Sequence, residues 1–381
     1  MRFSVDAHAI GCHLTGNEVY VRNLLDSFAA VDHDSEFVAY ISTPEAADVI
    51  PPGFASRTVS RNPFVRLGLD LPRLLSKDRP DLIHVQYTAP LGCPVPVVVS
   101  VHDVSFLECP QYFTVARALQ LRLTVRRTVA NAARVITGSE FSRNAIVRAY
   151  GLDEDKITVV PNAAAGIFRP LNPKDSAAWV QSRLGITSPF ILTVGDLQPR
   201  KNQTGLVAAF ADMIRSRPEL PHHLVLAGKG TFQADDVRKA AARSGVADRI
   251  HFTGFVSDAE LVQLYNACES FVFPSFYEGF GLPLLEAMAC ARPVACSDTS
   301  AVHEVADSCA VLFDPNSKEQ MAGAMLDLAL DAELRARMGR LSLRRSALFT
   351  WRKAAEKTLE VYYEVAAASV PVPRMSVSFA K

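Results

Sequence analysis

The stretch "SFVFPSFYEGFGLPLLEAMACA" (residues 270–291) holds one complete strand–loop–helix unit and decides the fold. The short apolar run "SFVFPS" predicts a buried strand. The following "LPLLEAMACA" places apolar side chains at helical spacing, and Pro283 suits the first helical turn, where its missing N–H costs nothing. The glycines between strand and helix predict a loop whose backbone N–H groups meet the helix N-terminus, which is a ready site for phosphate.

Two glutamates flank this loop. Glu278 precedes the glycines, and Glu286 lies about one turn inside the predicted helix. If the chain from Glu278 to Glu286 were wholly helical, it would span roughly 12 Å at ~1.5 Å per residue, which suits a diphosphate flanked by two sugars. We therefore expect two carboxylates that accept sugar hydroxyls on either side of a phosphate cradle. The structural alternatives are a solvated loop carboxylate at Glu278 and a buried, partnered carboxylate at Glu286.

Strand-like and helix-like patterns alternate along the whole chain, which is typical of parallel α/β sheets. In the first half we expect strands within residues 2–9, 36–42, 81–87, 95–103, 134–139 and 156–163. In the second half we expect strands within residues 190–195, 222–230, 249–256, 270–275, 293–298 and 310–315. Two α/β domains in series follow, each with ligand positions at the carboxyl ends of its strands.

Prolines and a glycine interrupt the segment "PNAAAGIFRPLNP" (Pro161–Pro173), which predicts an interdomain linker. The amphipathic segment "WRKAAEKTLEVYYEVAAA" (residues 351–368) is long enough to pack back across the domain boundary, and we expect the tail after Pro371 to fray. The predicted divisions are a first domain at 1–165, a linker at 166–173, a second domain at 174–350, and a crossover helix with its tail at 351–381.

The composition excludes several classes of protein. With 381 residues, of which 49% are hydrophobic, the chain can bury two cores. Forty basic residues balance forty acidic ones, which argues against a nucleic-acid binder, whose affinity depends on clustered positive charge. No apolar run approaches the ~20 residues of a membrane helix. Asp6 lies where a signal peptide would be apolar, so we expect a cytoplasmic protein.

One segment is basic with leucines between the charges. Arg117, Arg122, Arg126 and Arg127 lie in "ARALQLRLTVRRTV", which predicts either a solvated helix face or a peripheral contact with the inner face of a membrane, for reaching a lipid-linked acceptor. Of the two, the sequence favours the solvated face.

The stretch "EGFGLPLLE" resembles the E-x7-E signature of the retaining GT-B glycosyltransferases of family 4, also called group 1. The resemblance extends over nearly the whole chain through motifs that follow one another in the family's order. They are "SVHDVSF" (100–106), "TGSEFSR" (137–143), "VVPNAAAGIF" (159–168), "LTVGDLQPRKN" (192–202), "LAGKG" (226–230) and "GFVSDAELVQLY" (254–265). The resemblance implies an α/β GT-B fold, in which two Rossmann-like, doubly wound domains face each other across a cleft and a C-terminal helix crosses back to the first domain.

The resemblance also implies roles for residues of the second domain, which would hold a nucleotide-sugar donor. Glu278 would bind the donor hexose and Glu286 the ribose. The diphosphate would meet positive charge and backbone N–H groups, the contacts that stabilise a departing anion. The residues implied are Arg200 and Lys201 for the charge, Gly279, Phe280, Gly281 and Leu282 for the backbone, and Val256 beside the base.

In the first domain, which would bind a saccharide or glycolipid acceptor, His102 resembles the family histidine beside the reacting centre. Gly16, expected in the loop after the first strand, would let the backbone approach the phosphate and the acceptor. The structural alternative for His102 is a core histidine whose hydrogen bonds are satisfied within the protein, and for Gly16 it is an ordinary turn.

The chain departs from the family pattern at Asp196, where many relatives carry arginine, so the positive charge rests on Arg200 and Lys201 alone. The "PRKN" sequence resembles a mannosyltransferase-like subgroup, which favours GDP-mannose as donor. The acidic trios "DHD" (32–34) and "DED" (153–155) imitate a metal-binding D-x-D, but neither follows a convincing buried strand. We therefore expect no metal and no cofactor beyond the nucleotide-sugar.

The mechanism that the resemblance implies needs no nucleophile from the protein. The donor bond would stretch toward an oxocarbenium-like state, and the departing phosphate could accept the acceptor proton from the same face, with retention of configuration. Two other functions stay open at this point. One is a GT-B epimerase or hydrolase acting on the nucleotide-sugar itself, and the other is a non-catalytic nucleotide-sugar-binding subunit.

Overall fold

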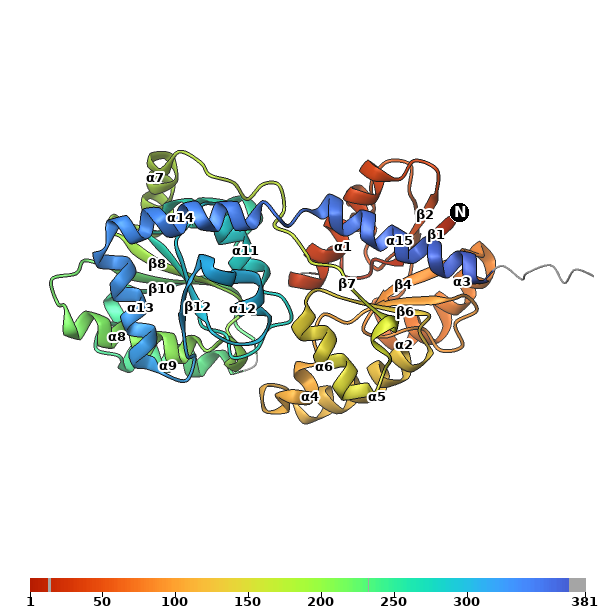
Figure 1. Cartoon of the computed structure of the whole chain (residues 1–381), viewed down its shortest axis with the longest axis horizontal. Helices are drawn as coiled ribbons and strands as arrows, with labels where there is room; N and C mark the ends of the chain where they lie inside the picture. Colours follow the sequence, from red (N-terminus) through yellow and green to blue (C-terminus); the bar gives the residue numbers. More distant parts are fainter. Residues whose placement is uncertain (13–14, 232, 370–381) are drawn as a thin grey trace, which may run out of the picture.

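The structure is a computed structural model that describes residues 1–12, 15–231 and 233–369. Its chain forms two α/β bodies that lie side by side (Figure 1). The chain passes from the first to the second body after β7, and α15 returns to the first body after α14 (Figure 1). The predicted frayed tail after Pro371 lies outside the described residues.

The first sheet has seven parallel strands in the order β3-β2-β1-β4-β5-β6-β7. The strands are β1 (Arg2–Asp6), β2 (Glu36–Ile41), β3 (Ala55–Thr58), β4 (Leu82–Gln86), β5 (Val97–Ser100), β6 (Arg134–Thr137) and β7 (Ile157–Val159). The six predicted strands are all present. The strand β3 was not predicted, because "ASRT" is an edge strand with partly exposed side chains and carries no apolar run.

The second sheet has six parallel strands in the order β10-β9-β8-β11-β12-β13, and the sequence predicts all of them. They are β8 (Phe190–Val194), β9 (His223–Ala227), β10 (Ile250–Gly254), β11 (Ser270–Phe273), β12 (Val294–Ser297) and β13 (Val311–Phe313). In each sheet the strand order reverses once, between β1 and β4 and between β8 and β11. Ligands of doubly wound sheets bind at the carboxyl ends of the strands beside such a switch point.

Helices cover both faces of each sheet, and each sheet therefore has two hydrophobic cores. In the first domain the helices are α1 (Thr15–Val31), α2 (Pro63–Val65), α3 (Leu71–Asp78), α4 (Ser105–Glu108), α5 (Val115–Asn131) and α6 (Glu140–Tyr150). The helices that follow are α7 (Pro173–Leu184), α8 (Gln203–Ser216), α9 (Ala234–Arg243), α10 (Asp258–Ala267), α11 (Leu282–Ala289), α12 (Ser300–Ala306), α13 (Lys318–Leu330), α14 (Ala332–Ser346) and α15 (Trp351–Ser369). Fully buried strands such as β4, β5, β11 and β12 follow from this double cover.

The helix α15 packs on α1 and on the first sheet, as predicted. Tyr362 is fully buried, its ring lies 5.1 Å from the ring of Phe3, and its hydroxyl lies 2.5 Å from His84 Nδ1. Phe168, which falls in the predicted linker, instead packs into the core of the second domain. The exact domain boundaries stay a prediction.

Among the described residues, no helix combines the length and the apolar composition that a membrane span requires.

Candidate active site

A cavity of about 480 Å³ lies between the two domains, at the carboxyl ends of the strands of both sheets. All of the residues that the sequence analysis assigns to a site line this cavity: Gly16 and His102 from the first domain, and Arg200, Lys201, Val256, Glu278, Gly279, Phe280, Gly281, Leu282 and Glu286 from the second. The structure thus brings these residues together, while their individual roles stay predictions.

The loop between β11 and α11 forms the second-domain wall of the cavity. The helix begins at Leu282, with Pro283 in its first turn, as predicted. Gly281 caps the helix with φ at +97°, a left-handed conformation that favours glycine. Because the first N–H groups of a helix have no partner within it, this loop and helix start present backbone donors to the cavity.

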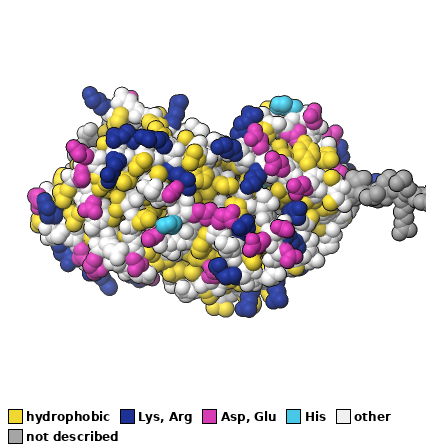
Figure 2. Space-filling view, in the orientation of Figure 1, with side chains coloured by type: hydrophobic (Ala, Val, Ile, Leu, Met, Phe, Trp, Pro, Cys, Tyr) yellow, Lys and Arg dark blue, Asp and Glu magenta, His cyan; other side chains and the backbone are white. Residues whose placement is uncertain are grey.

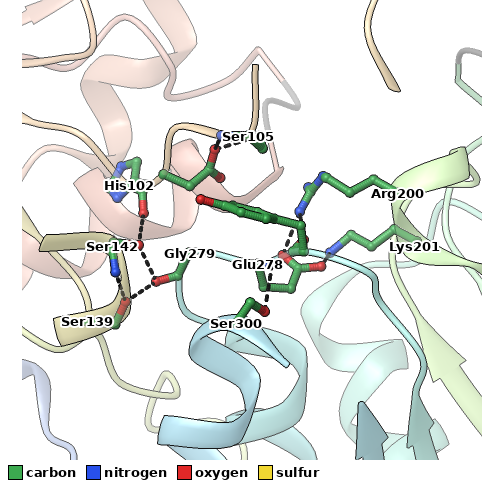
Figure 3. Close-up of polar contacts among 11 residues, drawn as sticks. His102, Ser105, Ser139, Ser142, Arg200, Lys201, Glu278, Gly279 and Ser300 are labelled. Carbon is green, nitrogen blue, oxygen red and sulfur yellow. Dashed lines mark hydrogen bonds and ion pairs between the residues drawn. The ribbon is translucent and has the colours of Figure 1, made fainter. Parts of the chain in front are cut away.

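Glu278 is paired with two cations (Figure 3). Arg200 Nη1 lies 2.9 Å from Glu278 Oε2, and Lys201 Nζ lies 2.6 Å from Glu278 Oε1. Both cations come from a short 3-10 helix, η5 (Pro199–Lys201), between β8 and α8. The side chains of all three residues are only 9–13% exposed. The carboxylate predicted to bind a hexose therefore shares its hydrogen bonds with the two cations predicted to bind phosphate.

The charges of this group stabilise one another. Burial would raise the pKa of Glu278, but the adjacent Arg200 and Lys201 outweigh burial and lower it to about 2. Burial lowers the pKa of Lys201, with Glu278 acting in the opposite direction. The Glu278 carboxylate is thus ionised at neutral pH. A negatively charged ligand that enters the cavity would compete with this carboxylate for the two cations.

Glu286 lies on α11 and is only 7% exposed. The hydroxyl of Tyr265 donates a hydrogen bond to Glu286 Oε2 at 3.0 Å. Burial raises the pKa of Glu286 to about 7, although the bond from Tyr265 opposes the rise. The two glutamates therefore differ in kind: Glu278 is held as an anion, and Glu286 can carry a proton near neutral pH.

His102 lies just beyond the end of β5, on the first-domain side of the cavity. Its Nε2 lies 3.1 Å from Gln86 Oε1, so Nε2 donates and Nδ1 is left as the acceptor of the ring. The ring of Tyr20 meets it edge-on at 4.7 Å. Burial lowers the pKa of His102 to about 4, so the imidazole is neutral. It can exchange hydrogen bonds with a bound sugar but supplies no positive charge.

One position, Gly16, differs from the predictions. Gly16 was expected in a loop, but it lies in the first turn of α1, and a Cβ there would meet no atom of the described residues within 4 Å. It lies in a helix N-terminus that lines the cavity, where no described neighbour requires glycine for steric reasons. Asp196, the departure from the family pattern, also lines the cavity, and burial raises its pKa against the effect of Lys229 and Lys201.

Several residues that line the cavity were not predicted from the sequence: Tyr20, Arg22, Tyr87, Asp103, Lys229 and Asp258. Tyr87 directly follows β4, and its place at the carboxyl end of a central strand was a usable signal. Arg22 and Asp258 form an ion pair at 2.6 Å between the two domains, and no local sequence pattern could have indicated this contact.

Within the described ranges, no group of three or more His, Cys, Asp or Glu side chains could hold a metal ion.

Comparisons with known proteins agree with this architecture. Residues 180–343 match the family model described as "Glycosyl transferases group 1", and residues 14–164 match the model described as "Glycosyltransferase Family 4". A curated relative, the O-antigen chain mannosyltransferase B of Escherichia coli, is 29% identical over 265 residues, which cover 70% of this chain and 69% of the relative.

Solved structures of low sequence identity show the same fold. Sucrose-phosphate synthase from Thermosynechococcus elongatus matches with a TM-score of 0.77 at 21% identity, covering 97% of this chain and 99% of that one. The Anabaena protein HepE, solved in complex with UDP-glucose, matches with a TM-score of 0.75 at 17% identity, covering 95% of this chain and 99% of that one.

Proposed function

This chain belongs to the group 1 glycosyltransferases and has their GT-B fold, and from that premise we propose that it transfers a hexose from a nucleotide-sugar to a saccharide or lipid-linked acceptor with retention of configuration. The observation that carries the proposal is the shared cavity, in which Glu278, Arg200 and Lys201 lie beside the start of α11, opposite His102.

The proposed donor lies along the start of α11. Its diphosphate accepts hydrogen bonds from the N–H groups of the loop and the helix start. It also pairs with Arg200 and Lys201, which exchange part of their contact with Glu278 for the phosphate oxygens. Glu278, relieved of one partner, accepts hydroxyls of the hexose. Glu286 accepts the ribose hydroxyls in its ionised form.

The proposed reaction is driven by stabilisation of the leaving group. As the glycosidic bond breaks, negative charge develops on the diphosphate next to the two cations and the oriented N–H groups. The acceptor hydroxyl attacks from the same face and passes its proton to the departing phosphate, so the configuration is retained. Neutral His102 positions the reacting sugar through a hydrogen bond. Positive charge comes from side chains, and the proposed reaction is independent of metal and of any other cofactor.

We propose GDP-mannose as the donor. Support comes from the "PRKN" sequence and from the relative that is named a mannosyltransferase. A thermal-shift panel of UDP-, GDP- and ADP-sugars tests this assignment, because a donor at a hundredfold excess over its dissociation constant stabilises the fold by ~2.7 kcal/mol. A selective shift with GDP-mannose is expected, and a selective shift with another sugar nucleotide would replace it.

Product analysis tests the reaction itself. With an acceptor present, NMR of the anomeric proton should show the configuration of the donor. A free sugar or an altered nucleotide-sugar formed equally with and without acceptor would point to a hydrolase or an epimerase. A protein that binds donor but turns none over would be a binding subunit.

We also propose a peripheral membrane contact for reaching a lipid-linked acceptor. On α5, Val115, Leu119 and Leu123 are 85%, 54% and 62% exposed, and they share one face of the helix with the exposed Arg122 and Arg126. Hydrophobic and basic side chains lie together at the lower edge of the molecule in Figure 2, where Figure 1 shows α4 and α5. Co-sedimentation with vesicles that rises with anionic lipid is expected, and binding without such dependence would count against this contact.

A further inference from the structure

The first turn of α6, in the first domain, is capped by a side chain of the second domain. Glu304, on α12, accepts a hydrogen bond from Glu140 N through Oε1 and from Phe141 N through Oε2, both at 3.0 Å. A helix cannot satisfy its first N–H groups by itself, and a carboxylate at that end also meets the positive end of the helix dipole. The next N–H, of Ser142, donates to the helix's own cap, Ser139 Oγ, at 3.1 Å. Two of the first three donors of α6 are therefore satisfied from the opposite domain.

Two serine hydroxyls of the same turn reach the loop between β11 and α11 (Figure 3). Ser139 Oγ donates to the carbonyl oxygen of Gly279 at 2.8 Å, and Ser142 Oγ lies 3.1 Å from the same oxygen and 3.0 Å from the carbonyl oxygen of His102. Neither serine has exposed surface. In a trans peptide the carbonyl and the following N–H point in opposite directions. The serines thus fix the direction of the Phe280 N–H, which lies in the loop proposed to bind phosphate.

The two domains meet at Gly279 without room for a side chain. A Cβ there would lie 2.0 Å from the carbonyl oxygen of His102 and 2.8 Å from Asp103 Cβ. Such distances are far below van der Waals contact, so the approach of the loop to the first domain depends on glycine.

The helix α12 connects these contacts. At its start, Ser300 Oγ accepts from Glu278 N at 3.1 Å, and Ala301 N donates to Glu278 O at 3.4 Å. One turn later the same helix carries Glu304, whose backbone oxygen accepts from Arg345 Nη2 of α14 at 2.8 Å. The short helix α12 therefore contacts the loop between β11 and α11 and also carries the cap of α6.

We propose that Glu304, Ser139 and Ser142 form an interdomain latch that holds the cleft closed and, in that state, sets the orientation of the Gly279–Phe280 peptide. They are positioning residues, which act through the loop and through the relative placement of the domains. The effect on the phosphate rests on the proposed function, whereas the latch itself does not. The motif "TGSEFSR" then has a physical role: it supplies a helix start that only the second domain completes.

Hydrogen exchange on the full chain tests the latch without any nucleotide. In Glu304→Ala, which removes both acceptors, the amides of Glu140 and Phe141 should exchange about tenfold faster or more, as expected from loss of hydrogen bonds to a charged group. In Glu304→Gln, which keeps one neutral acceptor oxygen, at least one of the two amides should do so. Small-angle scattering of the same variants should show a larger radius of gyration. The control Glu333→Gln, exposed on α14, should change neither quantity. Unchanged exchange of the two amides in both Glu304 variants would overturn the latch.

Kinetics test the positioning of the loop. In Ser142→Ala, which keeps the backbone of α6, kcat should fall about tenfold, the scale of one lost hydrogen bond, with little change in the donor KM. The control Ser182→Ala, exposed on α7, should leave kcat unchanged. A Ser142→Ala variant with wild-type kcat would refute the positioning role. A wild-type chain that transfers no sugar would refute the proposed function instead, and exchange would still decide the latch.

Discussion

Replacing Lys201 by alanine tests the role of charge at the leaving group. Lys201 Nζ lies 2.6 Å from Glu278 Oε1 and 5.0 Å from the centroid of the Phe273 ring, and its side chain is 12% exposed. In the proposed complex this ammonium faces the diphosphate. Removing one such preorganised electrostatic donor costs about 10²–10³ in kcat, or about 2.7–4 kcal/mol.

The cost to folding should be smaller. The substitution leaves Arg200 in place, and its Nη1 lies 2.9 Å from Glu278 Oε2, so we expect the buried carboxylate to keep one cation. The fold then loses one hydrogen bond between charged groups, about 1.5–3 kcal/mol. The two costs can be separated because a folded variant with a lowered Tm still reports its kcat.

Initial rates at saturating donor and acceptor provide the assay, with circular dichroism to verify folding. Lys239→Ala is the matched control, because Lys239 is exposed on α9 and, among the described residues, forms one ion pair, with Asp236 at 3.8 Å. A near-normal kcat in Lys201→Ala would refute the assignment of Lys201 to the leaving group.

Three further predictions concern protonation, packing and metal. Burial raises the pKa of Glu286 from 4.5 to about 7, so between these pH values the folded chain retains a proton that the unfolded chain releases. This group therefore makes the free energy of unfolding fall as pH rises from about 4.5 to about 7. In urea titrations, Glu286→Gln should flatten this part of the pH profile, and an unchanged slope would contradict the shift in pKa. Gly279→Ala should open the cleft in small-angle scattering and lower kcat, because its Cβ would lie 2.0 Å from the carbonyl oxygen of His102. The control Gly323→Ala, whose Cβ would have no described atom within 4 Å, should do neither. EDTA should leave the transfer rate unchanged after dialysis, and a rate restored only by a divalent cation would remove the metal-independent mechanism.

The sequence predicted the fold well because its strands are short, apolar and separated by helix-length segments. The exception is β3, whose "ASRT" sequence lies at a sheet edge and owes its conformation to pairing with β2. Gly16 was placed in a loop, since glycine near a strand end favours a turn, but the helix α1 already includes it.

The site was predicted as a set of residues but not as a geometry. The motif around Glu278 and the pair Arg200 and Lys201 lie 77 residues or more apart in the chain, and no spacing could indicate that they bond directly. The capping of α6 by Glu304 could not be predicted from the sequence for the same reason. Contacts of this kind depend on how two separately folded sheets dock, and local patterns carry no information about docking.

The most direct test is a crystal structure of the chain with its nucleotide-sugar bound. It should show the diphosphate on the N–H groups at the start of α11, within hydrogen-bond distance of Lys201, with Glu278 on the hexose and Glu286 on the ribose. A nucleotide bound away from α11, or one that leaves both glutamates without sugar contacts, would contradict the account.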